Sequence, residues 1–246
     1  MNVLREIIET EIAFPGSFTN AEERAWGVMY HNVEIADSYD SNHAWIRRGD
    51  LRAAAREVDA FYRGKGLVPR VYQMVPPGEA DPLRPVLEEA GFAIRVQPAK
   101  LFLYTGSAGR APRAGVQFRC IREADAALLD MIECSDGLRA RKVIARRVRA
   151  VDYHLLVGTV DGRPVTLGSL QSIGAFTRTD DVLTDVAERG RGYGLALTHA
   201  MIAYHAEHIG DTLYLYADDP VAIRMYLKAG FEPLDPPLTW YWASKG

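Results

Sequence analysis

The most informative part of this chain of 246 residues is Arg189-Gly190-Arg191-Gly192-Tyr193-Gly194. It follows a strand-like run at residues 181–187 and opens a helical run at residues 195–209. A glycine-rich turn at a helix start exposes backbone N–H groups that have no partner inside the helix, and the helix dipole adds positive potential. The stretch therefore predicts a binding site for an anion such as a pyrophosphate.

The spacing of these glycines differs from the two commoner phosphate-binding loops. The dinucleotide pattern would need glycine where Leu195 stands, and the nucleotide-triphosphate loop would need a Gly-Lys-Ser/Thr that is absent. The pattern is Arg-x-x-Gly-x-Gly, for which a plain tight turn between strand and helix is the alternative.

A second motif follows. Residues 212–216 read as a strand and residues 221–229 as a helix. The motif is Asp219-Pro220-Val221-Ala222-Ile223-Arg224-Met225-Tyr226, and Gly230-Phe231 comes shortly after it. The two motifs together resemble the coenzyme A loop and the later helix of the GNAT N-acetyltransferases, where the second motif reads Asn-x-x-Ala-x-x-x-Tyr.

The resemblance implies an α/β (α+β) fold, in which a mixed, mostly antiparallel twisted sheet is flanked by helices. It also implies an acyltransferase that uses acetyl-CoA as co-substrate and needs no metal. His205 and His208 lie at helical spacing, but no third metal ligand stands near them in the sequence. Asp219 replaces the family's asparagine, which removes a hydrogen-bond donor.

The sequence contains an internal repeat. Ala90-Gly91-Phe92 and Ala229-Gly230-Phe231 stand 139 positions apart, each after a helical run. Between the halves, residues 106–115 are rich in small and turn residues. We therefore expect two tandem GNAT-like units: a degenerate domain at residues 1–105, a linker at 106–115 and an acetyl-CoA-binding catalytic domain at 116–246.

The first copy lacks the chemistry of the second. Leu87 stands where the second copy has Tyr226, and Arg47-Arg48-Gly49-Asp50 replaces the glycine loop. Asp50 reads as a helix N-cap, so its carboxylate would occupy the helix end that a phosphate needs. We expect no coenzyme A in this copy; packing and substrate shaping are its expected role, with a separate ligand as the alternative.

The resemblance assigns the cofactor site residue by residue. In the family the strand before the loop splays from its neighbour, and its free amides hold the pantetheine arm, while the loop receives the pyrophosphate. The expected cofactor-binding residues are Thr184, Asp185, Val186, Ala187, Arg189, Gly190, Arg191, Gly192, Tyr193, Gly194 and Leu195. Only two residues separate Val186 from Arg189, where the family commonly has four.

Two catalytic residues follow from the resemblance. Tyr226 would protonate the departing thiolate, with a core tyrosine as the alternative. Asp180 would take the proton of the attacking amine, and Asp181, Asp185 and Glu188 are nearby carboxylates that are otherwise solvated surface groups. The expected activity is N-acetylation of a primary amine of a small molecule or peptide. A non-catalytic acyl-CoA-binding sensor is the alternative, and a longer acyl donor or aminoacyl-tRNA is a third.

Composition sets the partners and the compartment. The net charge of −3 favours no nucleic acid, and the basic run at residues 139–149 reads as a solvated helix face or as a contact for an anion. No apolar run suggests a membrane span or a signal peptide. Cys120 and Cys134 are the only cysteines, which fits a reducing, cytoplasmic location. Both a monomer and a homodimer stay open.

Overall fold

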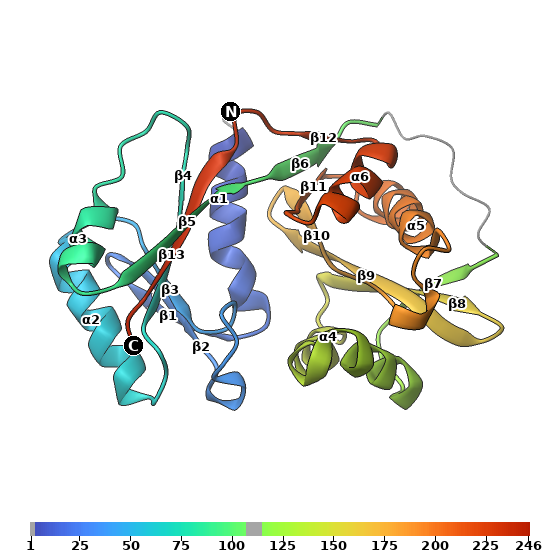
Figure 1. Cartoon of the computed structure of the whole chain (residues 1–246), viewed down its shortest axis with the longest axis horizontal. Coiled ribbons are helices and arrows are strands. Elements are labelled where there is room, and N and C mark those ends of the chain that lie inside the picture. The colour runs from blue at the N-terminus through green and yellow to red at the C-terminus, as the bar shows by residue number, and fades with distance from the viewer. Residues whose placement is uncertain (1–2, 107–114) are drawn as a thin grey trace. The chain divides into compact units, whose positions relative to one another are not determined.

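The computed structural model describes residues 3–106 and 115–246 and divides the chain into two compact units (Figure 1). The first unit comprises residues Met1–Ala99 and Pro236–Gly246, and the second comprises Lys100–Asp235. Each unit is a mixed sheet flanked by helices, so the predicted fold of two tandem units is confirmed.

The first unit holds a six-stranded sheet in the order β1-β2-β3-β4-β13-β5. All neighbouring strands are antiparallel except β3 and β4, which are parallel. Its elements are α1 (Val3–Ala13), β1 (Asn20–Arg24), β2 (Gly27–His31), β3 (His43–Ile46), α2 (Leu51–Gly64), β4 (Arg70–Val75), α3 (Leu83–Glu89), β5 (Ala93–Ala99) and β13 (Leu238–Ser244), with short 3-10 turns at Phe14–Ser17 and Val33–Ile35.

The core of the first unit lies between the sheet and the helices α2 and α3. Val58 and Tyr62 of α2 are fully buried and pack with Leu87 of α3 and Tyr241 of β13. Leu87, the counterpart of Tyr226 in the sequence repeat, is therefore packing material. Burial of such side chains contributes about 1.5–3 kcal/mol each, which explains why the helices pack on this face.

The second unit holds a seven-stranded sheet in the order β12-β6-β11-β10-β9-β8-β7. Neighbours are antiparallel except β10 and β11, which are parallel. Its elements are β6 (Leu101–Tyr104), β7 (Gln117–Ile121), α4 (Ala126–Arg147), β8 (Tyr153–Val160), β9 (Arg163–Ile173), β10 (Phe176–Thr184), the 3-10 turn η3 (Val186–Glu188), α5 (Tyr193–His208), β11 (Thr212–Tyr216), α6 (Pro220–Lys228) and β12 (Phe231–Pro233).

Glycines shape the second unit at two points. The β8–β9 hairpin turns at Asp161 and Gly162, whose φ angles of 48° and 77° suit a tight two-residue turn. On β9, Gly168 lets α5 approach the sheet, because a Cβ there would lie 2.6 Å from the sulfur of Met201. The helix α5 thus packs closely on one face of the sheet, and α4 packs on the other face.

The helix α4 is two helices joined at a bend. Gly137 has φ 84° and ψ 172°, outside the helical region. The second of the two helices carries most of the basic run and ends at Arg147. Arg139, Lys142 and Arg146 of that run are exposed, as expected for a solvated face, whereas Arg147 is buried.

The two units divide the chain differently from the domain bounds expected from the sequence. Residues 93–104 form two strands that are separated at Lys100. The strand β5 joins the first sheet, and β6 joins the second. The last strand, β13, lies in the first sheet between β4 and β5. Backbone pairing between distant segments decides both assignments. The expected linker, except Gly106 and Gly115, lies outside the described residues.

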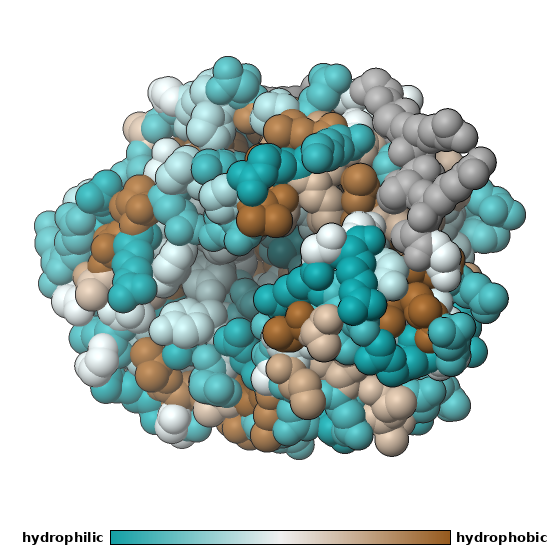
Figure 2. Space-filling view, turned by 45° about the vertical axis from the view of Figure 1, so that its right-hand side comes forward, coloured by the Kyte–Doolittle hydropathy of each residue, from teal (hydrophilic) through white to brown (hydrophobic). Residues whose placement is uncertain are grey.

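The visible surface mixes polar and apolar side chains. Figure 2 shows hydrophilic residues over most of this face, with apolar ones scattered among them. Across residues 3–106 and 115–246, no helix combines the length and the apolar character that crossing a membrane requires.

Candidate active site

The head of α5 is open. Its N-cap is Gly192, with φ 83°, and among the described residues no side chain caps the helix. A Cβ added at Gly190 or Gly192 would meet no described atom within 4 Å. The first backbone N–H groups of α5 therefore have no side-chain cap, and the glycines before them leave room for a ligand, as an anion site needs.

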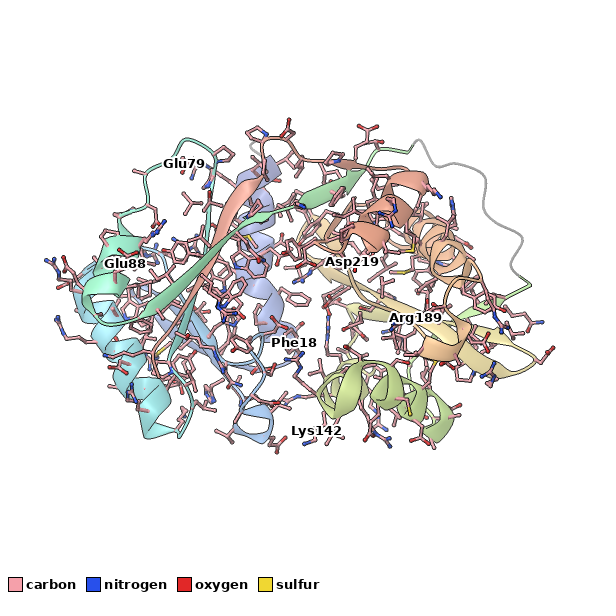
Figure 3. All side chains as sticks on the ribbon, viewed as in Figure 1. Phe18, Glu79, Glu88, Lys142, Arg189 and Asp219 are labelled. Atoms are coloured by element: carbon pink, nitrogen blue, oxygen red, sulfur yellow. The ribbon has the colours of Figure 1, made fainter. Side chains whose placement is uncertain are left out.

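Charged side chains brace this loop. Figure 3 shows Arg189 in the segment between β10 and α5; its Nε donates to the Thr184 carbonyl at 3.3 Å. Glu188, only 6% exposed, accepts a hydrogen bond from Arg163 and forms an ion pair with Arg191 at 2.9 Å. Two guanidinium groups thus neutralise the carboxylate that lies nearest to the glycines, which keeps the loop suitable for an anion.

The strand before the loop separates from its parallel neighbour. Pairing of β10 with β11 runs from Phe176 to Thr179 and then stops, although β10 continues to Thr184. A bulge interrupts its pairing with β9 between Asp180 and Leu183, and Asp181 has φ 51°. A bulge bends a strand, so residues 180–184 have an edge that β11 does not cover. The splayed strand expected from the resemblance is present.

The free amides differ from those expected. The amide of Asp185 donates to the Val165 carbonyl at 3.0 Å, and the amide of Ala187 donates to the Asp185 carboxylate at 3.0 Å. These two amides are occupied because Asp185 caps the η3 turn. The uncovered edge lies earlier in the strand, at residues 180–184.

Asp180 and Asp181 share one buried arginine. Arg147, from the last turn of α4, donates through Nη1 to Asp180 at 3.1 Å and to Asp181 at 2.9 Å. Tyr153 of β8 and Ser169 of β9 donate their hydroxyls to Asp181 at 2.7 and 2.9 Å. The two carboxylates therefore lie inside a polar cluster on the α4 face of the sheet.

The surroundings of the two carboxylates shift their pKa values in opposite directions. Burial opposes ionisation of Asp180, but the charges of Arg178 and Arg147 outweigh it and hold its pKa below the usual value. Burial, with the negative charge of Asp180, raises the pKa of Asp181. Asp180 is therefore ionised at neutral pH, and Asp181 is the member of the pair that takes up a proton more readily.

Tyr226 lies on α6, close enough to Asp180 to respond to its charge. Its side chain is 6% exposed, and its ring packs on Phe231 with centroids 5.8 Å apart. Burial, together with the charge of Asp180, raises the pKa of Tyr226, so the hydroxyl keeps its proton at neutral pH. Asp219, labelled in Figure 3, caps α6 by accepting from the amides of Val221 and Ala222.

The corresponding helix head in the first unit is closed. Asp50 caps α2 by accepting from the amide of Ala53 at 3.0 Å. The amides of Arg47 and Arg48, which precede this helix, donate to the carbonyl of Trp26 at 2.8 and 3.3 Å. These three amides are thus already used and cannot meet a phosphate.

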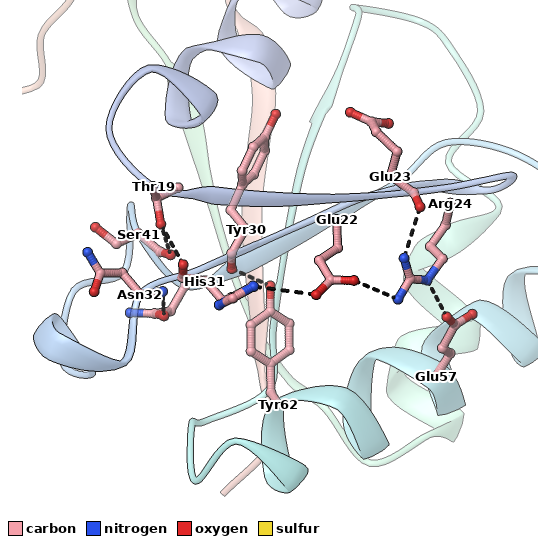
Figure 4. A network of polar contacts seen from close by, with 11 residues as sticks. Thr19, Glu22, Glu23, Arg24, Tyr30, His31, Asn32, Ser41, Glu57 and Tyr62 are labelled. Atoms are coloured by element: carbon pink, nitrogen blue, oxygen red, sulfur yellow. Dashed lines mark hydrogen bonds and ion pairs between the residues drawn. The ribbon is translucent and has the colours of Figure 1, made fainter. Parts of the chain in front are cut away.

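Side-chain contacts hold the β1–β2 hairpin against α2. Figure 4 shows Arg24, at the end of β1, reaching Glu57 of α2; the Nε–Oε1 distance is 2.7 Å. The indole N–H of Trp26 donates to the same carboxylate at 2.7 Å. Both contacts hold the β1–β2 turn against α2, and with it the carbonyl that occupies the loop amides.

Sequence reasoning missed most of the cluster around Asp180. Arg147 belongs to the basic run at residues 139–149, which the sequence indicated only as a solvated helix face or a contact for an anion. Tyr153 and Ser169 lie on strands where no motif marks them. His205, considered as a metal ligand, instead contacts the Asp211 carboxylate at 2.8 Å.

Comparisons with known proteins agree with this geometry. The sequence profile of the acetyltransferase (GNAT) family matches residues 126–231, and no curated protein matches the sequence. A GCN5-related N-acetyltransferase from Kribbella flavida has a similar structure, with a TM-score of 0.70 at 19% identity, covering 98% of this chain and 95% of that chain.

Two further structures share the fold over most of the chain. A GCN5-related N-acetyltransferase-like protein from Streptococcus suis has a TM-score of 0.58 at 15% identity, covering 96% of this chain and 93% of its own. A tandem GNAT protein from the clavulanic acid biosynthesis pathway has a TM-score of 0.58 at 16% identity, covering 83% and 75%. The chain shares the fold of these structures, and its residues 126–231 match the acetyltransferase (GNAT) family.

Proposed function

We propose that this protein is an N-acetyltransferase that moves an acetyl group from acetyl-CoA to a primary amine of a small molecule or peptide. The observation that carries the proposal is the open head of α5, where Gly192 leaves the backbone N–H groups without a side-chain cap among the described residues. Family membership of this domain supports acetyl transfer.

The donor would lie along the splayed strand and the glycine loop. Amides from Gly190 to Leu195 would bind the pyrophosphate, with Arg189 and Arg191 adding positive charge. The pantetheine arm would follow the uncovered edge of β10 toward Thr184, beside Val186. The Asp185 and Ala187 amides contribute no donors in this arrangement, because they are already bonded.

The reaction needs a proton acceptor and a proton donor. An amine such as that of lysine has a pKa near ~10.4, so it must lose a proton before it can attack the thioester. Asp180, ionised at neutral pH, would attract the cationic amine and accept its proton, directly or through water. Tyr226, protonated at neutral pH, would donate to the leaving thiolate. The paired acidic side chains favour a cationic acceptor.

A thiol-release assay with purified protein, acetyl-CoA and a panel of primary amines tests the proposal. We expect thiol release that depends on the amine and mass spectra that show an amide product. Binding of acetyl-CoA without amine-dependent release would instead establish the non-catalytic sensor. A cytoplasmic location and a homodimer stay predictions.

A further inference from the structure

The inference concerns Arg147, whose guanidinium joins two neighbouring carboxylates. Its side chain is 2% exposed, and Nη1 alone reaches Oδ2 of both Asp180 and Asp181. The guanidinium also lies over the ring of Tyr153, 4.3 Å from its centroid. A buried arginine placed this way contributes charge and geometry together, because its fork is rigid.

The same contacts hold a strained residue. Asp181 adopts φ 51°, a conformation that side chains other than those of Asn and Asp rarely take, and it lies in the bulge of β10. Three donors from three elements fix its Oδ2: Arg147 from α4, Tyr153 from β8 and Ser169 from β9. Strain of this kind persists where the surroundings over-determine it.

We propose that Arg147 is a positioning residue, which holds Asp180 and Asp181 together and so keeps the bulge of β10 in the shape that presents Asp180 to the acceptor amine. This role rests on the proposed function. Without the guanidinium, two adjacent buried carboxylates would repel each other, and the bulge would lose the contact that ties it to α4.

The proposal has a consequence for protonation. The charged and titratable groups that face the pair are Arg147 from α4, Arg178 on β10, Tyr153 from β8 and Tyr226 from α6. Removing Arg147 leaves one cation, Arg178, beside two carboxylates. The pair would then retain a proton to higher pH than in the wild-type protein.

Arg147→Met tests this role, because methionine fills space but carries no charge. We expect the acid limb of the kcat–pH profile to move up by at least one pH unit. Adding Asp181→Asn should move it back, since asparagine tolerates the left-handed backbone and removes the like charge. Arg146→Met, one residue away and exposed, is the matched control and should leave the profile unchanged.

A carboxyl-carbon NMR titration of the aspartates gives a second readout that needs no turnover. The inference predicts the same upward shift in Arg147→Met, and in Arg147→Gln if the methionine variant does not fold. An unchanged titration in a folded variant would overturn it. Absence of thiol release by the wild-type protein would refute the proposed function alone, because the titration would still report on Arg147.

Discussion

Asp180 and Tyr226 carry the proposed chemistry at the scale of single residues. Their environments push their pKa values in opposite directions. Arginines keep Asp180 ionised, while burial and that negative charge keep Tyr226 protonated. An acid and a base that remain distinct at one pH are what proton transfer in both directions requires.

Replacing Tyr226 by phenylalanine removes only the proton donor. We expect kcat to fall at least ten-fold and at most about 10²-fold, with little change in the dissociation constant of acetyl-CoA. Tyr104→Phe is the matched control, because Tyr104 packs on the same Phe231 ring at 5.6 Å. Steady-state kinetics with calorimetry check this, and an unchanged kcat in Tyr226→Phe would exclude the hydroxyl from the reaction.

His43 gives the first unit a predicted dependence on pH. Burial, opposed only in part by its hydrogen bond to Tyr39, lowers the pKa of His43 from 6.5 to about 3. The unfolded chain therefore binds the proton more readily, so stability is full above about pH 6.5 and is lost as pH falls toward 3, by about 1.4 kcal/mol per pH unit.

His43→Phe should remove that dependence. Urea unfolding at pH 7, 6 and 5 would measure the slope of the free energy of unfolding in both proteins. We expect a flatter slope in the variant, whose ring still stacks on Tyr72. Equal slopes would mean that His43 is not the buried neutral group that its contacts with Tyr39 and Trp45 indicate.

The residue types of the glycine loop were predictable, whereas those around Asp180 were not. A loop is local, so spacing along the chain shows which glycines stand at a helix head. The Arg147 cluster joins four elements, and its members come together only through sheet register and the bend of α4. The left-handed backbone at Asp181 has no sequence signal, because aspartate is common in ordinary strand ends.

At the scale of elements, the N-termini of α5 and α2 differ in how they are capped. The helix α5 begins at a glycine with open space around it, whereas α2 begins at a capping aspartate under a fastened hairpin. Both follow a strand that runs parallel to the next one. The same supersecondary unit is therefore open in one copy and closed in the other, which is the difference that the sequence predicted from Asp50.

Asp50→Ala tests whether the cap alone closes the first copy. We expect about 1 kcal/mol less stability, because one helix-end donor loses its acceptor. The number of acetyl-CoA molecules bound per chain should stay the same, since Trp26 still occupies the amides of Arg47 and Arg48. Calorimetric titration reads both copies at once, and a second site in the variant would contradict this view of the hairpin.

Some elements with strong local patterns were found in the sequence: the helix expected at residues 195–209 is α5 (Tyr193–His208), and the strand expected at residues 212–216 is β11. Asp161-Gly162 is likewise a strong turn signal, and the hairpin turns there. The helix α1 and the strands β1 to β3 were not predicted. Those strands are short, and the sheet stabilises them more than their own residues do.

At the scale of the whole molecule, the last strand of the chain belongs to the first unit and not to the second. The last eleven residues of the chain complete the sheet of the first unit, and residues 100–235 form the second unit. Sequence reasoning placed the end of the chain with the catalytic copy, because the order of elements repeats. Which sheet a strand joins depends on pairing between residues far apart, and periodicity carries no record of it.

Tyr241→Ala tests that assignment. Tyr241 is 1% exposed on β13 and donates to Asp81 in the first unit, so its removal should cost about 3–5 kcal/mol. Hydrogen exchange should rise in β4 and β5 and stay unchanged in β8 and β9. Thr239→Ala, at an exposed position of the same strand, is the control. Faster exchange confined to the second unit would contradict the observed pairing.

Calorimetric titration with acetyl-CoA of wild-type protein, Gly192→Ala and Gly210→Ala tests the central claim most directly. Gly192 and Gly210 lie at opposite ends of α5 with φ of 83° and 81°, and neither has a described atom near a built Cβ, so alanine strains both alike. We predict one site per wild-type chain, affinity at least ten-fold weaker in Gly192→Ala, and unchanged affinity in Gly210→Ala. No binding by the wild-type protein, or equal affinities in the two variants, would contradict the account.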